Sequence, residues 1–266
     1  MERNHYFLLA SLPPLCLEEP SSLSLSKFHQ WVFPHLSERE RGDLLSFQRI
    51  IDLHNLRALW AGNKPKRDSL LPIETLEERS DDLFLLSPPF SSFLRHYLAV
   101  EERLSHFPQL LLAQFRWEIN RSKGFLHEAL SLLQAVYLIS FALQNWEERR
   151  DWVRCLQDID AFDPLIDSLL KQREMAHYTP PVQFRQLEEI FATYPENTAR
   201  LREMQLAFLF SLFEEKRLAL PLFSFSHLLC YLIQLSLLTE KHRKRIQEGE
   251  EVLETIIQQS LREKSA

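Results

Sequence analysis

Side chains that could do chemistry are scattered along the chain instead of being gathered in motifs. The ten histidines occur singly, and no HExxH, HxH or Cys–His spacing of the kind that holds zinc is present. His177 and the pair His127-Glu128 come nearest to candidates. A lone histidine on a helix is more often a hydrogen-bonded polar group than a ligand. The sequence therefore predicts no metal site and no cofactor.

Carboxylates and glycines give no catalytic pattern either. Adjacent acidic residues occur at Glu101-Glu102, Glu147-Glu148 and Glu214-Glu215, but neighbours on a helix point about 100° apart and make poor acid–base pairs. The chain has no GxSxG, and its four glycines form no phosphate-cradling loop. We expect no catalytic residue, and we expect the isolated chain neither to bind nor to hydrolyse ATP.

One basic cluster stands out, the run KHRKR near the end of the chain. It has two interpretations, a grip on an acidic partner or lipid headgroups, and a solvated turn balanced by the glutamates that follow it. The net charge of -6 and the lack of interleaved aromatic residues argue against nucleic acid. The candidate partner contacts are Lys241, Arg243, Lys244 and Arg245.

A polar pair, Asp52 and Asn55, lies on one face of an expected helix among Leu53, Leu56 and Leu59. Polar groups beside so many apolar ones need hydrogen-bond partners. We interpret the pair as a structural anchor that ties its helix to a neighbour, with a partner contact as the alternative.

Two long segments, Ala129–Trp146 and Leu218–Thr239, contain no Asp, Glu, Lys or Arg. Helices that are apolar almost all round must be buried, in a helical body or in a bilayer. Pro221 interrupts the second segment, and polar residues interrupt both. We therefore expect both to be core helices of a soluble protein. The start of the chain lacks the features of a signal peptide, and three distant cysteines suit a reducing cytoplasm.

No segment alternates with period two, so the sequence predicts an all-α fold. Ser37 and Glu40 form a capping box that opens a helix ended by Gly62. We expect one helical domain over residues 1–266, with pseudo-repeated parts around 1–88, 89–180 and 181–266. Further helices are expected over Lys27–Val32, Phe90–Leu104, from Pro108 through Trp146 with a division near Gly124, from Pro164, from Pro181, from Pro195, from Ser224 or Ser226, and from Ile246 to Leu261.

Six segments, in order along nearly the whole chain, carry a family resemblance. They resemble segments of a bacterial family encoded among V-type ATPase genes. In order, they are the opening YFLLASLPPL, an Asp-x-x-Asn helix, a PPFSSF helix start, a Trp-Glu-x-Asn helix, an FSF stretch before a Tyr-Leu helix, and a Gly-Glu turn. The segments are Tyr6–Leu15, Asp52–Leu59, Pro88–Phe93, Trp117–Asn120, Phe223–Leu235 and Gly249-Glu250.

That family in turn resembles a shortened form of the C/d-type protein of the V/A-type ATPase central stalk. The resemblance implies an all-helical, non-catalytic adaptor between the rotating shaft and the membrane proteolipid ring, peripheral at the cytoplasmic face of the inner membrane. Membrane contact would come through the complex, and no nucleotide would bind. Alternatives are an assembly or scaffold factor and a small-molecule hydrolase. The implied structural anchors are Asp52, Asn55, Trp117, Glu118, Asn120 and Tyr231.

Overall fold

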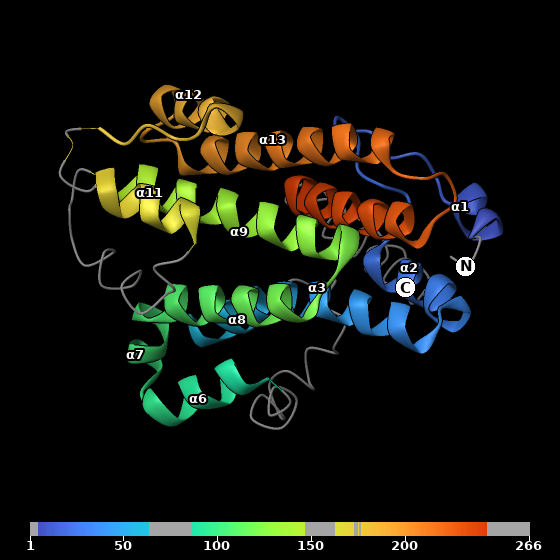
Figure 1. The fold of residues 1–266 in the computed structure, drawn as a ribbon, viewed down its shortest axis with the longest axis horizontal. Coiled ribbons are helices and arrows are strands. Elements are labelled where there is room, and N and C mark those ends of the chain that lie inside the picture. The colour runs from blue at the N-terminus through green and yellow to red at the C-terminus, as the bar shows by residue number, and fades with distance from the viewer. Residues whose placement is uncertain (1–4, 64–86, 147–162, 173–174, 176, 244–266) are drawn as a thin grey trace, which may run out of the picture. The chain divides into compact units, whose positions relative to one another are not determined.

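The computed structural model describes residues 5–63, 87–146, 163–172, 175 and 177–243. Every regular element in these ranges is a helix, and no strand occurs among them (Figure 1). The all-α fold predicted from the sequence is confirmed. The expected last helix, Ile246–Leu261, lies outside the described residues.

The chain divides into two compact units, one of residues 29–195 and one of residues 1–28 with 196–266. This division differs from the single domain and from the three successive parts expected from the sequence. The reason is that the two ends of the chain pack together: the Tyr231 hydroxyl donates to the Pro13 carbonyl (2.8 Å), and Lys241 Nζ donates to the Leu17 carbonyl (2.9 Å). Such pairings across more than 200 residues leave no local trace in a sequence.

The unit of residues 29–195 is built around α3, α8 and α9, with α8 packed against α3, α6 and α9. Large apolar side chains from these helices fill its core, among them Leu53, Phe90, Phe107 and Leu130. Its helices are η1 (Phe33–His35), α3 (Glu38–Trp60), α6 (Pro88–His96), α7 (Val100–Ser105), α8 (Phe107–Arg121), α9 (Gly124–Asn145), α11 (Pro164–Gln172), η2 (Val182–Phe184) and α12 (Arg185–Thr193).

Helix α3 begins and ends as its local sequence predicts. The Ser37 side chain accepts from the Glu40 amide, and the Glu40 carboxylate accepts from the Ser37 amide, so the capping box is complete. At the other end Gly62 takes φ +71°, a conformation that glycine adopts at little cost. These two signals fix the ends of the long helix that carries Asp52 and Asn55.

The single helix expected over Phe90–Leu104 is wrong, because α6 ends at His96 and α7 begins at Val100. Tyr97 is extended between them, with φ -111° and ψ 103°. Its carbonyl accepts from Arg103 Nε (3.0 Å), and its ring stacks on His106 with centroids 4.2 Å apart. Side-chain contacts with the following helices therefore stabilise the break. The division near Gly124 is found, between α8 and α9.

The unit of residues 1–28 and 196–266 contains α1 (Tyr6–Ser11), the first part of α2 (Leu25–Val32), α13 (Thr198–Ala219) and a helix over residues 225–243. Ser224 opens the last of these by accepting from the His227 amide (3.2 Å), as one of the two predicted caps. The Phe28 ring stacks on Tyr231 with centroids 5.9 Å apart. The helix over 225–243 thus packs against residues from the first part of the chain.

The first apolar segment has a buried face and the second is buried from Leu228 to Leu238, as expected for core helices, whereas Leu218 and Leu222 at the start of the second segment are exposed. Between Leu228 and Leu238 every residue except Ser236 is buried. In α9 the face formed by Leu126, Ala129, Leu130, Leu138 and Ile139 is buried. Within the described residues α9 is also the one helix long and apolar enough to cross a membrane by length and composition, a property that core helices of soluble proteins share.

A buried polar stripe runs along α3. Gln48, Asp52 and Asn55 are 2%, 3% and 0% exposed, and their spacing of four and three places them on one face. Gln48 contacts the His29 ring from α2. Burial lowers the pKa of His29 to about 4, because a charged imidazolium is poorly solvated in the interior.

We predict that Asn55→Leu lowers the free energy of unfolding by about 1–3 kcal/mol, because it leaves a buried neighbour without its hydrogen bond. Chemical denaturation measures this. Asn120→Leu is the matched control, since Asn120 is exposed on α8, and it should change stability by about 0.5 kcal/mol or less. Equal effects of the two substitutions would contradict the anchor role of Asn55.

The lowered pKa of His29 predicts a stability loss at acid pH. The unfolded chain takes up this proton near pH 6.5 and the folded chain only near pH 4, so stability falls as pH drops between those values. Relative to wild type, His29→Gln should remove a loss on the order of 2 kcal/mol over that interval. Urea titrations at several pH values test this, with the exposed His35→Gln as control. Parallel curves for wild type and His29→Gln would refute it.

Candidate functional site

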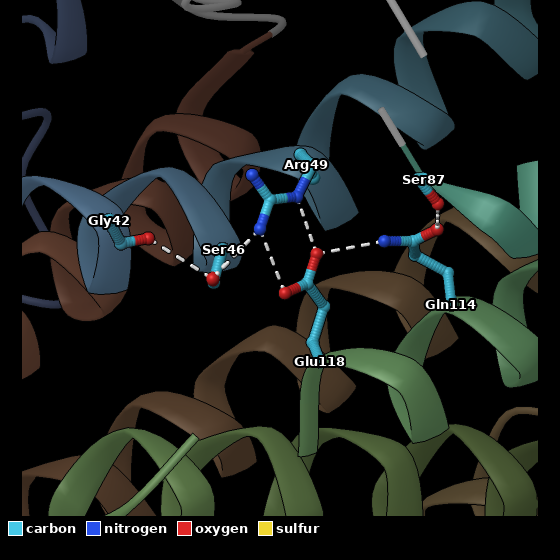
Figure 2. Close-up of polar contacts among 6 residues, drawn as sticks. All are labelled: Gly42, Ser46, Arg49, Ser87, Gln114 and Glu118. Atoms are coloured by element: carbon cyan, nitrogen blue, oxygen red, sulfur yellow. Dashed lines mark hydrogen bonds and ion pairs between the residues drawn. The ribbon is translucent and has the colours of Figure 1, made fainter. Parts of the chain in front are cut away.

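Polar groups from two helices converge on the buried Glu118 carboxylate of α8, inside the unit of residues 29–195 (Figure 2). Arg49 of α3 donates through Nε to Oε1 (2.5 Å) and through Nη2 to Oε2 (2.9 Å). Gln114, one turn earlier on α8, donates through Nε2 to Oε1 (2.8 Å). The Ser87 hydroxyl, at the start of α6, donates to Gln114 Oε1 (2.5 Å).

Local geometry explains why these side chains meet. Gln114 and Glu118 are four residues apart on α8 and so lie on one face. Ser46 and Arg49 are three apart on α3, and Arg49 Nη2 donates to Ser46 Oγ (2.9 Å). The Ser46 hydroxyl in turn donates to the Gly42 carbonyl (3.1 Å) (Figure 2). The network therefore joins α3, α8 and the start of α6.

Trp117 lies beside this network as a platform for cations. The Arg49 guanidinium is 5.5 Å from its ring centroid, and the Arg121 guanidinium is 4.7 Å away. Cations over an indole face are attracted by its quadrupole. Trp117 thus helps to orient the arginine that neutralises Glu118.

Both oxygens of the Glu118 carboxylate are buried and hydrogen-bonded. The Glu118 side chain is 1% exposed, against 31% for the Arg49 side chain, and three donors reach its two oxygens. A buried carboxylate with a paired cation is tolerated, and removing that cation leaves an uncompensated charge. An acid or base needs an accessible proton site, so this arrangement suits the joining of helices better than proton transfer.

The structure brings some of the predicted anchors together and separates others. Trp117 and Glu118 belong to the network, and Tyr231 ties its helix to Pro13. Asp52 and Asn55 are buried on α3. Asn120 differs from the prediction: it is exposed, because two residues along a helix from Glu118 it points to another face.

The basic run near the end of the chain is not one exposed patch. Lys241 is a correction to the predicted partner contacts, since its side chain is 8% exposed and it donates to the Leu17 carbonyl. His242 is also buried and its Nε2 lies 3.0 Å from the same carbonyl. Arg243 is exposed. Lys244 and Arg245 lie outside the described residues.

A second polar cluster, in the unit of residues 1–28 and 196–266, was missed by sequence reasoning. Glu214 accepts from Arg217 and from Gln234 Nε2 (2.7 Å), and Arg217 Nη1 lies 3.5 Å from His227 Nε2. The signal that could have found it is the Glu214–Arg217 spacing of three on one helix. The bonds from Arg217 lower the pKa of Glu214.

Cys230 lies in the helix that also carries His227 and Gln234, yet its setting does not activate the thiol. Burial raises the pKa of Cys230 to about 12, and Sγ donates to the Phe213 carbonyl (3.3 Å). Nucleophilic catalysis needs a thiolate, which a lowered pKa provides. Burial also lowers the pKa of His227, and the Arg217 cation adds to that effect. The cluster therefore suits packing of α13 against the helix over residues 225–243.

Metal binding has no candidate in the part of the chain that the structure describes. There, no three or more His, Cys, Asp or Glu side chains gather in a group that could hold an ion. Cys16 is exposed and Cys230 is buried.

We predict that Arg49→Met lowers the free energy of unfolding by about 2–4 kcal/mol, because it leaves the Glu118 charge buried and uncompensated. Adding Glu118→Leu to that variant should restore much of the loss, since both charges are then gone. Thermal or urea unfolding of the three proteins measures this.

Lys171→Met is the control for this prediction. Lys171 pairs with Asp167 at 2.5 Å, but the two side chains are 74% and 46% exposed, so the change should stay within about 1 kcal/mol. A double variant no more stable than Arg49→Met alone would contradict the proposed cause.

Comparisons with known proteins give the family of this chain. Proteins from Chlamydia trachomatis and Chlamydia pneumoniae, each described as an uncharacterized protein, are 22% and 24% identical to it over 199 and 198 residues. These alignments cover 71% of this chain and 73% and 74% of the relatives. No solved structure matches the chain. A family described as "Protein of unknown function (DUF2764)" matches residues 1–264, and the chain therefore belongs to that family.

Proposed function

We propose that this protein is a non-catalytic part of a bacterial V-type ATPase that links the rotating shaft to the membrane proteolipid ring. The observation that carries the proposal is that the interior polar groups bond helices to one another. Arg49, Glu118, Gln114 and Ser87 join α3, α8 and the start of α6 to one another, and the Cys230 thiol is held protonated by burial. Groups used in this way stiffen a body and do not form a reaction centre.

A part that transmits torque must resist shear, and packed helices tied by buried polar bonds supply that resistance. The long helices α3, α9 and α13 span 23, 22 and 22 residues, so each is about 33 Å long or more. The Arg49–Glu118 pair crosses from α3 to α8 and opposes sliding of one along the other.

The link to an ATPase itself comes from the motif resemblance. The segments from Tyr6–Leu15 to Phe223–Leu235 follow one another as they do in the family encoded beside V-type ATPase genes. On this proposal the chain acts at the cytoplasmic face of the membrane and needs no nucleotide or cofactor. Its partners are the shaft proteins and the proteolipid ring.

Two alternatives make different demands. An assembly or scaffold factor would bind partial complexes and leave the finished enzyme. A small-molecule hydrolase would need converging titratable groups in an accessible pocket. Glu118 is buried and hydrogen-bonded, and the Cys230 thiol is protonated, so neither residue suits the reaction centre of a hydrolase.

The test is purification of the tagged full chain from detergent-solubilised membranes of cells that produce a V-type ATPase. We expect shaft and ring proteins to elute with it in fixed proportion to the assembled enzyme. Arg243→Glu should weaken that association, most strongly at low salt, because a carboxylate at this exposed position would repel an acidic contact. Arg185→Glu, at an exposed position of α12, is the matched control.

Recovery of the chain without any other ATPase component at low salt would overturn the proposal. Recovery with partial complexes alone would favour the assembly factor. We expect the isolated chain not to bind ATP, because the sequence offers no phosphate-binding loop. Calorimetry that finds tight, stoichiometric ATP binding would therefore favour an enzyme.

A further inference from the structure

Four large apolar side chains are strongly exposed in the unit of residues 1–28 and 196–266. Tyr6 and Phe7 of α1 are 49% and 86% exposed, and Leu218 and Leu222, at and just after the end of α13, are 78% and 74% exposed. The two segments meet, because the His5 amide donates to the Phe223 carbonyl (2.8 Å). We call these four residues the apolar tip.

The exposure of the apolar tip is built into the backbone. The Tyr6 ring packs edge-on against Phe223, with centroids 4.7 Å apart. Phe223 has φ 61°, a left-handed conformation that a bulky side chain adopts only at a cost and that tends to occur at functional sites. The chain after α1 is fixed in turn, since the Pro13 carbonyl accepts from Tyr231. The backbone on both sides of α1 is thus fixed by defined contacts.

Charge is absent from the sequence around the apolar tip. No Asp, Glu, Lys or Arg occurs from Tyr6 to Leu17 or from Leu218 to Thr239. Lys216 lies just before the second of these stretches, in the last turn of α13, and Arg217 beside it pairs with Glu214. Apolar side chains with an amphipathic tyrosine and a cation at the edge are the composition of a segment that enters a membrane interface.

The small size of the apolar tip favours a bilayer over a protein as the surface that it contacts. A stable protein interface covers roughly 800 Å² on each side, more than four side chains can provide. Those side chains also protrude, whereas an interface needs a surface of matching shape. A lipid surface requires no matching shape, and a few inserted side chains are enough for peripheral binding.

We propose that the apolar tip inserts into the headgroup region of a lipid bilayer and anchors this unit there directly. This goes beyond the function proposed above, in which membrane contact comes through the ATPase complex, and it does not depend on it. Vesicles free of protein test it, so a failure here leaves the ATPase assignment standing, and the reverse also holds.

The experiment is flotation of the full chain with vesicles of phosphatidylcholine, alone or with a minority of phosphatidylglycerol. We expect the chain to float with both, because insertion is driven by apolar surface. Phe7→Ser and Leu222→Ser should each lower the partition coefficient about tenfold, from the loss of one inserted apolar side chain. Both positions are exposed, so the fold should survive, which circular dichroism checks.

Leu98→Ser is the matched control. Leu98 is 76% exposed, close to the 74% of Leu222, but it lies between α6 and α7 in the other unit. It should leave flotation unchanged. The proposal is overturned by a wild-type chain that floats with neither vesicle, by equal losses in Leu98→Ser and Leu222→Ser, or by adsorption to the anionic vesicles alone that Phe7→Ser leaves unchanged. It is also overturned if substitutions at the apolar tip abolish binding to a protein while vesicle binding is absent.

Discussion

A carboxylate buried in a helical body is the constraint on which the unit of residues 29–195 depends. Taking an ion out of water costs several kcal/mol unless a partner and hydrogen bonds compensate it. Glu118 meets that demand with Gln114 of its own helix and with Arg49 of α3. The two bonds from Arg49 form only when α3 lies against α8 at this level. The ion pair therefore favours that placement over others in which apolar helices could pack.

The sequence could predict the features that depend on neighbouring residues and on hydrophobic pattern. Features fixed within four residues were predicted: the capping box of Ser37 and Glu40, the stop at Gly62, and a cap at either Ser224 or Ser226, of which Ser224 is the one used. The all-α class and the burial of α9 and of Leu228–Leu238 followed from hydrophobic pattern, because such stretches have to be covered.

Features that join distant segments could not be read from local pattern. Arg49 and Glu118 are 69 residues apart, and Tyr231 and Pro13 are 218 apart. The same limit explains the expected helix over Phe90–Leu104, where local propensity favours continuation. The break at Tyr97 depends on contacts with Arg103 and His106, which form only once the chain has turned. Burial of Lys241 depends in the same way on the Leu17 carbonyl.

The short helix α1, in the unit of residues 1–28 and 196–266, is held in place by contacts with a distant segment of the chain. Six residues are too few to form a helix alone in water, and α1 has no buried residue. Its hydrogen bond and ring contact with Phe223 hold it in place, although Phe223 is itself in a conformation that costs energy. A chain selected for solubility alone would turn these apolar side chains inward or replace them. Their exposure on a backbone fixed by these contacts is what the proposed insertion into a bilayer requires.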